Sequence, residues 1–188
     1  MGLILASSSP RRKRILEDLG YNFECISPNI DESNSSNLKP IDYVIDVSER
    51  KGSHVWNNNQ SSHVLSGDTI IDFNGEIIGK PSSNGEALKI IQKLSNHTHS
   101  VISGLSLFYD SKVITIFDKT DVTFKGLSED VIQSYIESFD VLDKAGAYNI
   151  EDAENILIKH IDGCYNNIVG FPLKKFKMSK IKTILENL

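Results

Sequence analysis

The segment that decides the fold lies at the start of the chain and reads Leu3-Ile-Leu-Ala-Ser-Ser-Ser-Pro-Arg-Arg12. Its apolar half, residues 3–6, is typical of a buried strand and gives way at once to serines. Pro10 suits the first turn of a helix, because its fixed φ fits that position and its missing N–H is not needed there. The helix dipole disfavours cations at a helix start, so Arg11 and Arg12 indicate that an anion binds beside them. The segment predicts a strand, a hydroxyl-rich loop and a helix start that together bind phosphate.

Composition places the chain among ordinary globular proteins. It has 188 residues, of which 39% are hydrophobic and 24% charged, so we expect a single domain over residues 1–188. The net charge of −5 excludes a broad basic surface for a nucleic-acid polymer. We find no apolar run of membrane-spanning length and no secretory-signal pattern, and therefore expect no membrane partner and a cytoplasmic location. Cys25 and Cys164 are widely separated and fit buried or inert thiols better than a disulfide or a metal site.

Strand and helix signals alternate along the chain, which predicts an α/β fold. Asn74-Gly75 is the preferred turn of a two-residue β-hairpin and predicts one between residues 64 and 79. The capping residues Ser83 and Ser128 each begin a helix, and Val131 is expected on the buried face of the second. Strands are expected over 3–6, 22–27, 100–109 and 112–124, besides the hairpin over 64–79. Helices are expected over 10–19, 41–56, 83–94, 128–139 and from 172 onward, and a short apolar stretch lies near 156–161.

The sequence Ser66-Gly-Asp-Thr69 interrupts an apolar strand with an acidic side chain. A carboxylate is costly to bury without a partner, and Gly67 leaves room for a ligand beside the backbone. Asp68 is therefore a candidate to take a proton from water or to bind a divalent cation. The alternative is an aspartate that only ends the strand in a bulge.

Other charged residues fit the same chemistry. Lys80 is fixed between a glycine and a proline, and Lys51 lies in the second predicted helix; the alternatives are an exposed turn and a lysine stem lying along an apolar face. Asp31-Glu32 follows a strand and either completes a cation site with Asp68 or forms a solvated loop. We find neither a P-loop nor a nucleophile-elbow motif. The set favours electrostatic handling of a polyphosphate, with water as the attacking group.

Eight segments resemble, in order and spacing, the Maf-like nucleoside triphosphate pyrophosphatases, over residues 3–173. They are Leu5-Ala-Ser-Ser-Ser-Pro-Arg-Arg12, Asp31-Glu32, Glu49-Arg-Lys51, Gly67-Asp-Thr69, Gly79-Lys-Pro81, Leu94-Ser95 with Thr98-His99, Asp143-Lys-Ala-Gly-Ala-Tyr148, and Asn167-Ile-Val-Gly-Phe-Pro172. The resemblance implies a mixed α/β fold with an elongated twisted sheet and flanking helices around a deep cleft, similar to inosine triphosphate pyrophosphatases. It also implies a homodimer and a need for Mg²⁺ or Mn²⁺.

The family pattern implies roles for residues of this chain. Asp68 would activate the attacking water, and Glu32 would join it in positioning the metal. The reaction implied is hydrolysis of a nucleoside triphosphate to the monophosphate and pyrophosphate, with attack at the α-phosphorus. The residues that would hold the triphosphate are Ser7, Arg11, Arg12, Lys51 and Lys80.

The resemblance also bears on base preference. The branch similar to dTTP/UTP pyrophosphatases has Arg, Thr and Gln where this chain has Arg11, Thr69 and Glu151. Glutamine both donates and accepts, as a pyrimidine edge does, whereas an ionised glutamate only accepts and suits the adjacent N–H groups of guanine. Two of the three positions favour dTTP, UTP and modified uridine triphosphates. A 7-methyl-GTP or inosine-type pyrophosphatase and a nucleotide-binding regulator of cell division are the alternatives, and Glu151 also fits a plain acidic residue at a helix start.

Overall fold

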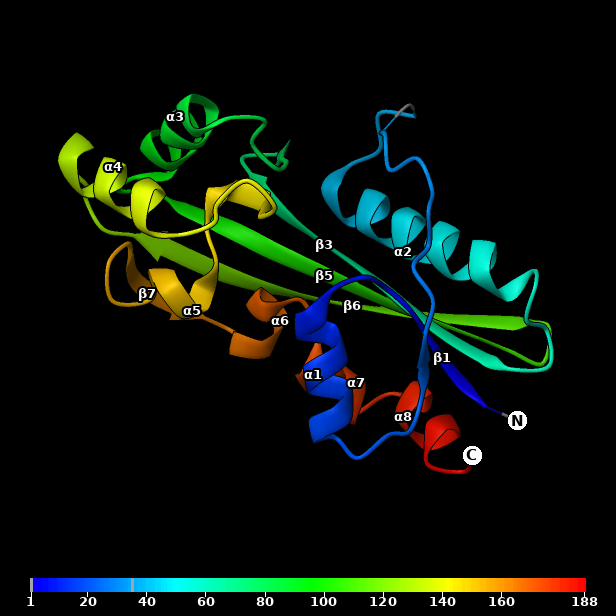
Figure 1. Cartoon of the computed structure of the whole chain (residues 1–188). Helices are drawn as coiled ribbons and strands as arrows, with labels where there is room; N and C mark the ends of the chain where they lie inside the picture. Colours follow the sequence, from blue (N-terminus) through cyan, green and yellow to red (C-terminus); the bar gives the residue numbers. More distant parts are fainter. Residues whose placement is uncertain (1, 35) are drawn as a thin grey trace.

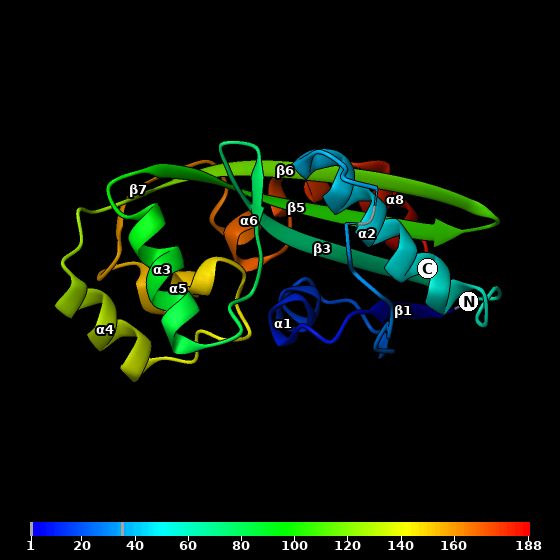
Figure 2. The ribbon, with the colours of Figure 1, turned by 90° about the horizontal axis from the view of Figure 1, so that it is seen from above.

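The computed structural model describes residues 2–34 and 36–188, which form one mixed seven-stranded sheet with helices on both sides (Figures 1 and 2). The strands are β1 (Leu3–Ala6), β2 (Glu24–Cys25), β3 (His63–Phe73), β4 (Glu76–Ile78), β5 (Thr98–Tyr109), β6 (Lys112–Phe124) and β7 (Ile158–Asp162). Their order is β2-β1-β3-β5-β6-β7, and β4 pairs with the far end of β3. β1 runs parallel to β2 and β3, and the other pairs are antiparallel. This sheet confirms the expected α/β class.

The helices are α1 (Pro10–Asp18), α2 (Pro40–Trp56), α3 (Asn84–Leu94), α4 (Glu129–Ser138), α5 (Ile150–Ala153), α6 (Tyr165–Val169), α7 (Leu173–Lys177) and α8 (Lys180–Leu185). In Figure 1, α2 lies on one side of the long strands β3, β5 and β6, and α1, α7 and α8 lie on the other. Both views place α3, α4 and α5 at the end of the sheet away from the two chain termini. Within the described ranges, none of these helices is long and apolar enough to cross a membrane.

Small polar side chains let α2 approach the sheet closely. Ser48 on α2 shares a 2.8 Å hydrogen bond with Ser106 on β5, and the Ser66 hydroxyl on β3 donates to the Ser48 carbonyl at 2.7 Å. All three serines are fully buried, and each hydroxyl has a partner, as burial requires. These contacts fix the position of α2 along β3 at Ser66, two residues before Asp68.

Several local sequence signals act as expected. Ser83 caps α3 by accepting from the Glu86 N–H at 3.2 Å, and Ser128 caps α4 by accepting from the Val131 N–H at 3.4 Å. Asn74 and Gly75 join β3 to β4 with φ of 57° and 86°, as a type I′ turn requires. These elements form where local preference and tertiary packing agree.

Cys25 and Cys164 are free thiols, as expected, and Cys25 is exposed. Three expectations are wrong. The strand expected over 22–27 is limited to β2, and Val131 is 39% exposed. The basic segment after Pro172 forms two helices, α7 and α8, instead of one. A continuous helix would place positions five residues apart about 140° from each other around the axis. The break at Met178 and Ser179 allows both Phe176 and Ile181 to be buried.

Gly146 provides a stability prediction. It has φ of +71°, and a Cβ there would lie 2.2 Å from the Ile71 Cδ1 atom. Left-handed backbone and overpacking are both unfavourable, so Gly146→Ala is expected to lower the free energy of unfolding by about 2–3 kcal/mol in urea denaturation. Gly85→Ala in the first turn of α3 is the matched control. It meets only the Ser83 Oγ at 4.0 Å and is expected to be neutral or stabilising. Equal losses in both variants would contradict the prediction.

Candidate active site

One pocket of about 580 Å³ brings the predicted site residues together. They are Ser7, Arg11, Arg12, Glu32, Lys51, Asp68, Thr69, Lys80 and Glu151. They come from the loop after β1, the start of α1, the loop before α2, α2 itself, β3, the segment after β4 and the start of α5. The volume is in the range of small-molecule sites, which is about 300–1,000 Å³. The pocket corresponds to the cleft expected from the sequence.

The centre of the pocket is a buried ion pair. Lys51 Nζ donates to Asp68 Oδ1 at 2.8 Å and lies 2.9 Å from Glu32 Oε2. Lys51 and Asp68 are 8% and 7% exposed, whereas half of the Glu32 side chain is exposed. A carboxylate this buried needs a cation or hydrogen-bond donors, and Lys51 supplies both. Asp68 lies in regular register opposite Gly104 of β5, so the interpretation of a bulge is wrong.

Helix α2 also positions the loop that carries Glu32. The Tyr43 hydroxyl donates to the Glu32 carbonyl at 2.6 Å, and Arg50 Nη1 donates to the Asp31 carbonyl at 2.5 Å. Burial raises the pKa of Tyr43, and the Asp68 and Glu32 charges raise it further. The Asp31 carboxylate accepts from the N–H and hydroxyl of Ser33, which lowers its pKa. Glu32 lines the pocket while the Asp31 side chain is bound within its own loop.

Arg12 joins three parts of the pocket wall. Its Nε donates to the Gly170 carbonyl at 2.9 Å, its Nη1 to Ser7 Oγ at 3.3 Å and its Nη2 to Thr69 Oγ1 at 2.9 Å. Burial lowers the pKa of the guanidinium, and the neighbouring Asp68 charge opposes that shift. The residue is only 8% exposed, so its main contacts are with the protein.

The sequence suggested that Gly67 leaves room for a ligand, but the Arg12 side chain lies in that space. A Cβ at this position would lie 2.8 Å from the Gly104 carbonyl oxygen and 3.2 Å from Arg12 Nε. The glycine therefore allows the Arg12 side chain, instead of a ligand, to lie against the β3 backbone.

The Thr69 hydroxyl belongs to a chain of hydrogen bonds whose direction is fixed. Ser103 Oγ donates to the Asn167 carbonyl at 2.7 Å, and Arg12 donates to Thr69. The 2.9 Å contact between Thr69 and Ser103 must then use the Thr69 proton, since a hydroxyl has only one. Toward the pocket Thr69 presents its remaining lone pair, so it accepts hydrogen bonds and does not donate them.

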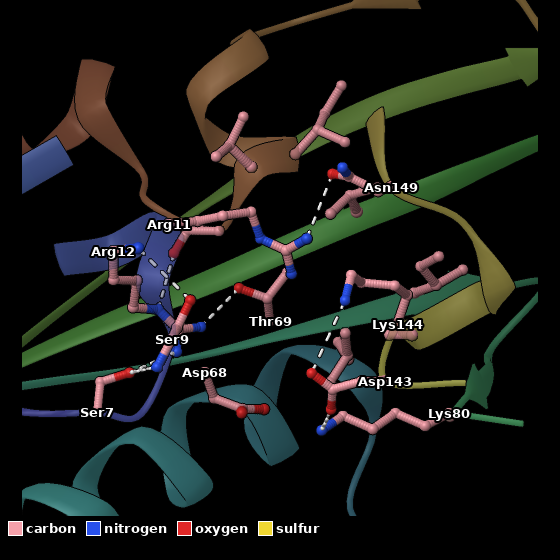
Figure 3. A pocket seen from close by; sticks show the side chains of 18 of the residues that line it. Ser7, Ser9, Arg11, Arg12, Asp68, Thr69, Lys80, Asp143, Lys144 and Asn149 are labelled. Carbon is pink, nitrogen blue, oxygen red and sulfur yellow. Dashed lines mark hydrogen bonds and ion pairs between the residues drawn. The ribbon is translucent and has the colours of Figure 1, made fainter. Parts of the chain in front are cut away.

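Arg11 extends toward Asn149, which the sequence analysis missed (Figure 3). Arg11 Nη1 donates to Asn149 Oδ1 at 3.3 Å, and the Asn149 amide donates to Asp152 Oδ2 at 2.9 Å. Glu151, two residues on, pairs with Arg14. The only signal for Asn149 in the sequence is a polar side chain within an otherwise apolar segment, Ala147 to Ile150. Apolar residues of the neighbouring wall are Ile71, Ile77, Ile78, Val101, Ile168 and Val169.

The opposite rim carries two lysines and an aspartate. Lys80 Nζ donates to Asp143 Oδ1 at 2.8 Å, which lowers the pKa of Asp143 (Figure 3). Lys144 Nζ lies 3.8 Å from the same carboxylate, and its side chain is 18% exposed. Asp143 and Lys144 were not predicted as site residues, although their segment is among those that resemble the family. Lys80 and Asp143 are mostly exposed and able to reorient when an anion binds.

The acidic residues of the pocket bear on metal binding. In the part of the chain that the structure describes, no three His, Cys, Asp or Glu residues cluster as a metal cage. Glu32 and Asp68 do converge on one point, the Lys51 ammonium. Mg²⁺ commonly takes one or two protein carboxylates and completes its shell with substrate phosphates and water. The donor set fits that type of site and does not fit a cage made by protein alone.

Fold and pocket together define an α/β protein whose mixed sheet carries a cationic pocket around a buried aspartate. Residues 2–179 match the model of the family described as Maf-like protein, and the chain belongs to this family.

Two relatives that are named for an enzymatic activity are similar to nearly the whole chain. A Bacillus cereus protein named dTTP/UTP pyrophosphatase is 40% identical over 173 residues, covering 92% of this chain and 91% of that protein. A Bacillus mycoides protein with the same name is 38% identical with the same coverage. Among solved structures, the Staphylococcus aureus Ham1 protein aligns with a TM-score of 0.45 and 14% identity, over 66% of this chain and 72% of its own.

Proposed function

We propose that this protein is a nucleoside triphosphate pyrophosphatase that acts on dTTP, UTP and modified uridine triphosphates. The observation that carries the proposal is the buried Asp68–Lys51 pair, in one pocket with the Ser7 loop and the two arginines that begin α1. The names of the Bacillus relatives, at 40% identity, support the same substrates.

In the proposed reaction, water attacks the α-phosphorus and the bond from this phosphorus to the oxygen that bridges to the β-phosphorus breaks. Lys51 binds Asp68 Oδ1, which leaves Oδ2 to accept the proton that the water loses. The nucleoside monophosphate gains the water oxygen, and pyrophosphate leaves with the bridging oxygen. General-base help of this kind contributes roughly 10²–10⁴-fold to a rate.

The triphosphate would be held by donors fixed in advance, which is the efficient way to stabilise developing charge. Ser7 Oγ accepts from Arg12 and from the Ser9 N–H at 3.2 Å, so its own proton is directed to a ligand. Arg12 acts mainly through Ser7 and through its charge, because three of its five N–H groups donate to protein acceptors. Arg11, Lys51 and Lys80 contribute charge directly.

The metal in this proposal is Mg²⁺ or Mn²⁺, held by Glu32 and Asp68 together with substrate phosphates. When bound, it would neutralise phosphate charge and polarise the phosphoryl oxygens. Lys51 keeps the two carboxylates close together before substrate arrives.

Of two other functions, one is supported by a particular residue and the other is disfavoured by one. Glu151 favours a 7-methyl-GTP or inosine-type pyrophosphatase, because a carboxylate accepts from the adjacent N–H groups of guanine. A nucleotide-binding regulator of cell division would use the same pocket without turnover. The buried Asp68 speaks against it, since binding an anion gains nothing from a nearby carboxylate.

The proposal also covers assembly and location. The resemblance to the family supports one domain over residues 1–188, a homodimer and a cytoplasmic location. Limited proteolysis tests the single domain, light scattering tests the homodimer, and cell fractionation tests the location.

The test is pyrophosphate release from a panel of canonical and modified triphosphates, with Mg²⁺ and with Mn²⁺. We expect the highest kcat/KM for dTTP and UTP, with equal amounts of monophosphate and pyrophosphate. In ¹⁸O-labelled water, the label is expected in the monophosphate, because attack is at the α-phosphorus. Preference for guanine or inosine triphosphates would support the first alternative, and tight binding without release would support the second.

A further inference from the structure

The pocket has two chemically different ends. Lys51, Asp68 and Lys80 gather charge at one end, where a triphosphate fits. The other end of the wall is formed by the segment Tyr148–Glu151 and by Ile168–Gly170. It offers apolar surface, the Asn149 amide with the Arg11 guanidinium bound to it, and a single carboxylate. A nucleobase requires such a surface, with a few polar groups to identify its edge. Glu151 therefore lies where the base edge would be read.

The Glu151 carboxylate is not alone at that end. Arg14 Nη2 donates to Glu151 Oε1, and this hydrogen bond raises the pKa of Arg14. Arg14 lies on α1 three residues after Arg11, which in turn binds Asn149. Two contacts thus join α1 to the segment at the start of α5. Glu151 lines the pocket, whereas Arg14 lies outside its wall and is 57% exposed.

We infer that Arg14 is a positioning residue for base selection, which occupies one oxygen of Glu151 and thereby disfavours guanine relative to uracil and thymine. The inference rests on the proposed function. Guanine presents two adjacent donors, N1–H and N2–H₂, which a carboxylate binds with both oxygens. Arg14 competes for one of those oxygens with a charge-assisted hydrogen bond. Uracil and thymine present a single donor, N3–H, for which one carboxylate oxygen is sufficient.

The same contact explains how a glutamate fits a pyrimidine site. A glutamine side chain would offer one acceptor and one donor. Because Arg14 binds one oxygen of Glu151, the pair likewise leaves one acceptor oxygen for the base. The charge at position 151, which by itself suggests a guanine site, is balanced by its neighbour on α1.

Arg14→Gln tests the inference through the ratio of kcat/KM for UTP and dTTP to that for GTP. Both carboxylate oxygens are then available, so the ratio is expected to fall about fivefold, which is the upper end for an exposed ion pair. Arg14→Lys keeps the charge and is expected to retain most of the preference. Lys13→Gln is the matched control on the same helix: its ammonium is 3.8 Å from Glu17, its side chain is 55% exposed, and the ratio should stay at the wild-type value. The ratio does not depend on the fraction of folded enzyme.

A second background shows whether Arg14 acts through Glu151. In Glu151→Gln, the further change Arg14→Gln is expected to leave the ratio unchanged, because the competing carboxylate is gone. An unchanged ratio in Arg14→Gln alone would overturn the inference, as would an equal change in both backgrounds. Absence of pyrophosphate release from every triphosphate by the wild-type enzyme would be recognised separately. It would overturn the proposed function and this inference together.

Discussion

Replacement of Asp68 by asparagine is expected to lower the kcat for pyrophosphate release from dTTP by roughly 10²–10⁴-fold. The amide has almost the same shape as the carboxylate but accepts no proton from the attacking water. Lys51 loses one anionic partner and retains the other, Glu32, at 2.9 Å. Nucleotide binding should therefore persist, measured by calorimetry with dTTP while turnover is measured with a coupled pyrophosphate assay.

Asp143→Asn is the matched control, since it makes the same chemical change to a carboxylate of the pocket rim. Asp143 binds Lys80 and is mostly exposed, so its loss should change kcat by less than about tenfold. Urea denaturation of both variants separates a catalytic loss from unfolding. If Asp68→Asn keeps near wild-type turnover, Asp68 is not the base, and another group must take the proton.

Much of the fold was predictable because local and tertiary preferences agree. The Asn74-Gly75 turn, the caps at Ser83 and Ser128 and the apolar strands each have a strong local signal, and each forms. The prediction of one continuous final helix was wrong because local and tertiary preferences disagree there. Lysine-rich sequence favours a continuous helix, but burial of both Phe176 and Ile181 requires a break between them.

The candidate site was predictable residue by residue but not contact by contact. Asp68 and Lys51 are noticeable in the sequence, because a charged side chain in an apolar segment is costly to bury without a partner. Their pairing, and the binding of Arg12 to Gly170, depends on how α1, α2 and the end of α6 pack onto β3. The contact between Arg14 and Glu151 joins positions 137 residues apart. Local sequence carries no signal for such a distance.

His99 behind the pocket wall is expected to make stability fall in acid. Its Nε2 lies 2.8 Å from the Tyr148 hydroxyl, and Tyr148 lines the pocket. Burial lowers the pKa of His99 from 6.5 to about 4, against a smaller opposing effect of Asp121. Between these pH values the unfolded chain binds a proton that the folded chain does not. The free energy of unfolding therefore decreases as the pH falls from 6.5 to 4, by about 3 kcal/mol from this residue.

Urea denaturation of His99→Gln over the same pH range measures this contribution. The variant is expected to be less stable than wild type at pH 6.5, with the difference shrinking by about 3 kcal/mol toward pH 4. His97→Gln is the control, because His97 is exposed and hydrogen-bonded to the Ser95 carbonyl at 2.8 Å, and it should keep the wild-type slope. If the free energy of unfolding of His99→Gln falls with pH as steeply as that of the wild type, other groups cause the loss of stability in acid. Protonation of His99 would put an N–H on both ring nitrogens. Nε2 has the Tyr148 hydroxyl as its partner, but Nδ1 has none in the described residues. The pocket wall around Tyr148 is therefore expected to lose its packing at a higher pH than the rest of the fold.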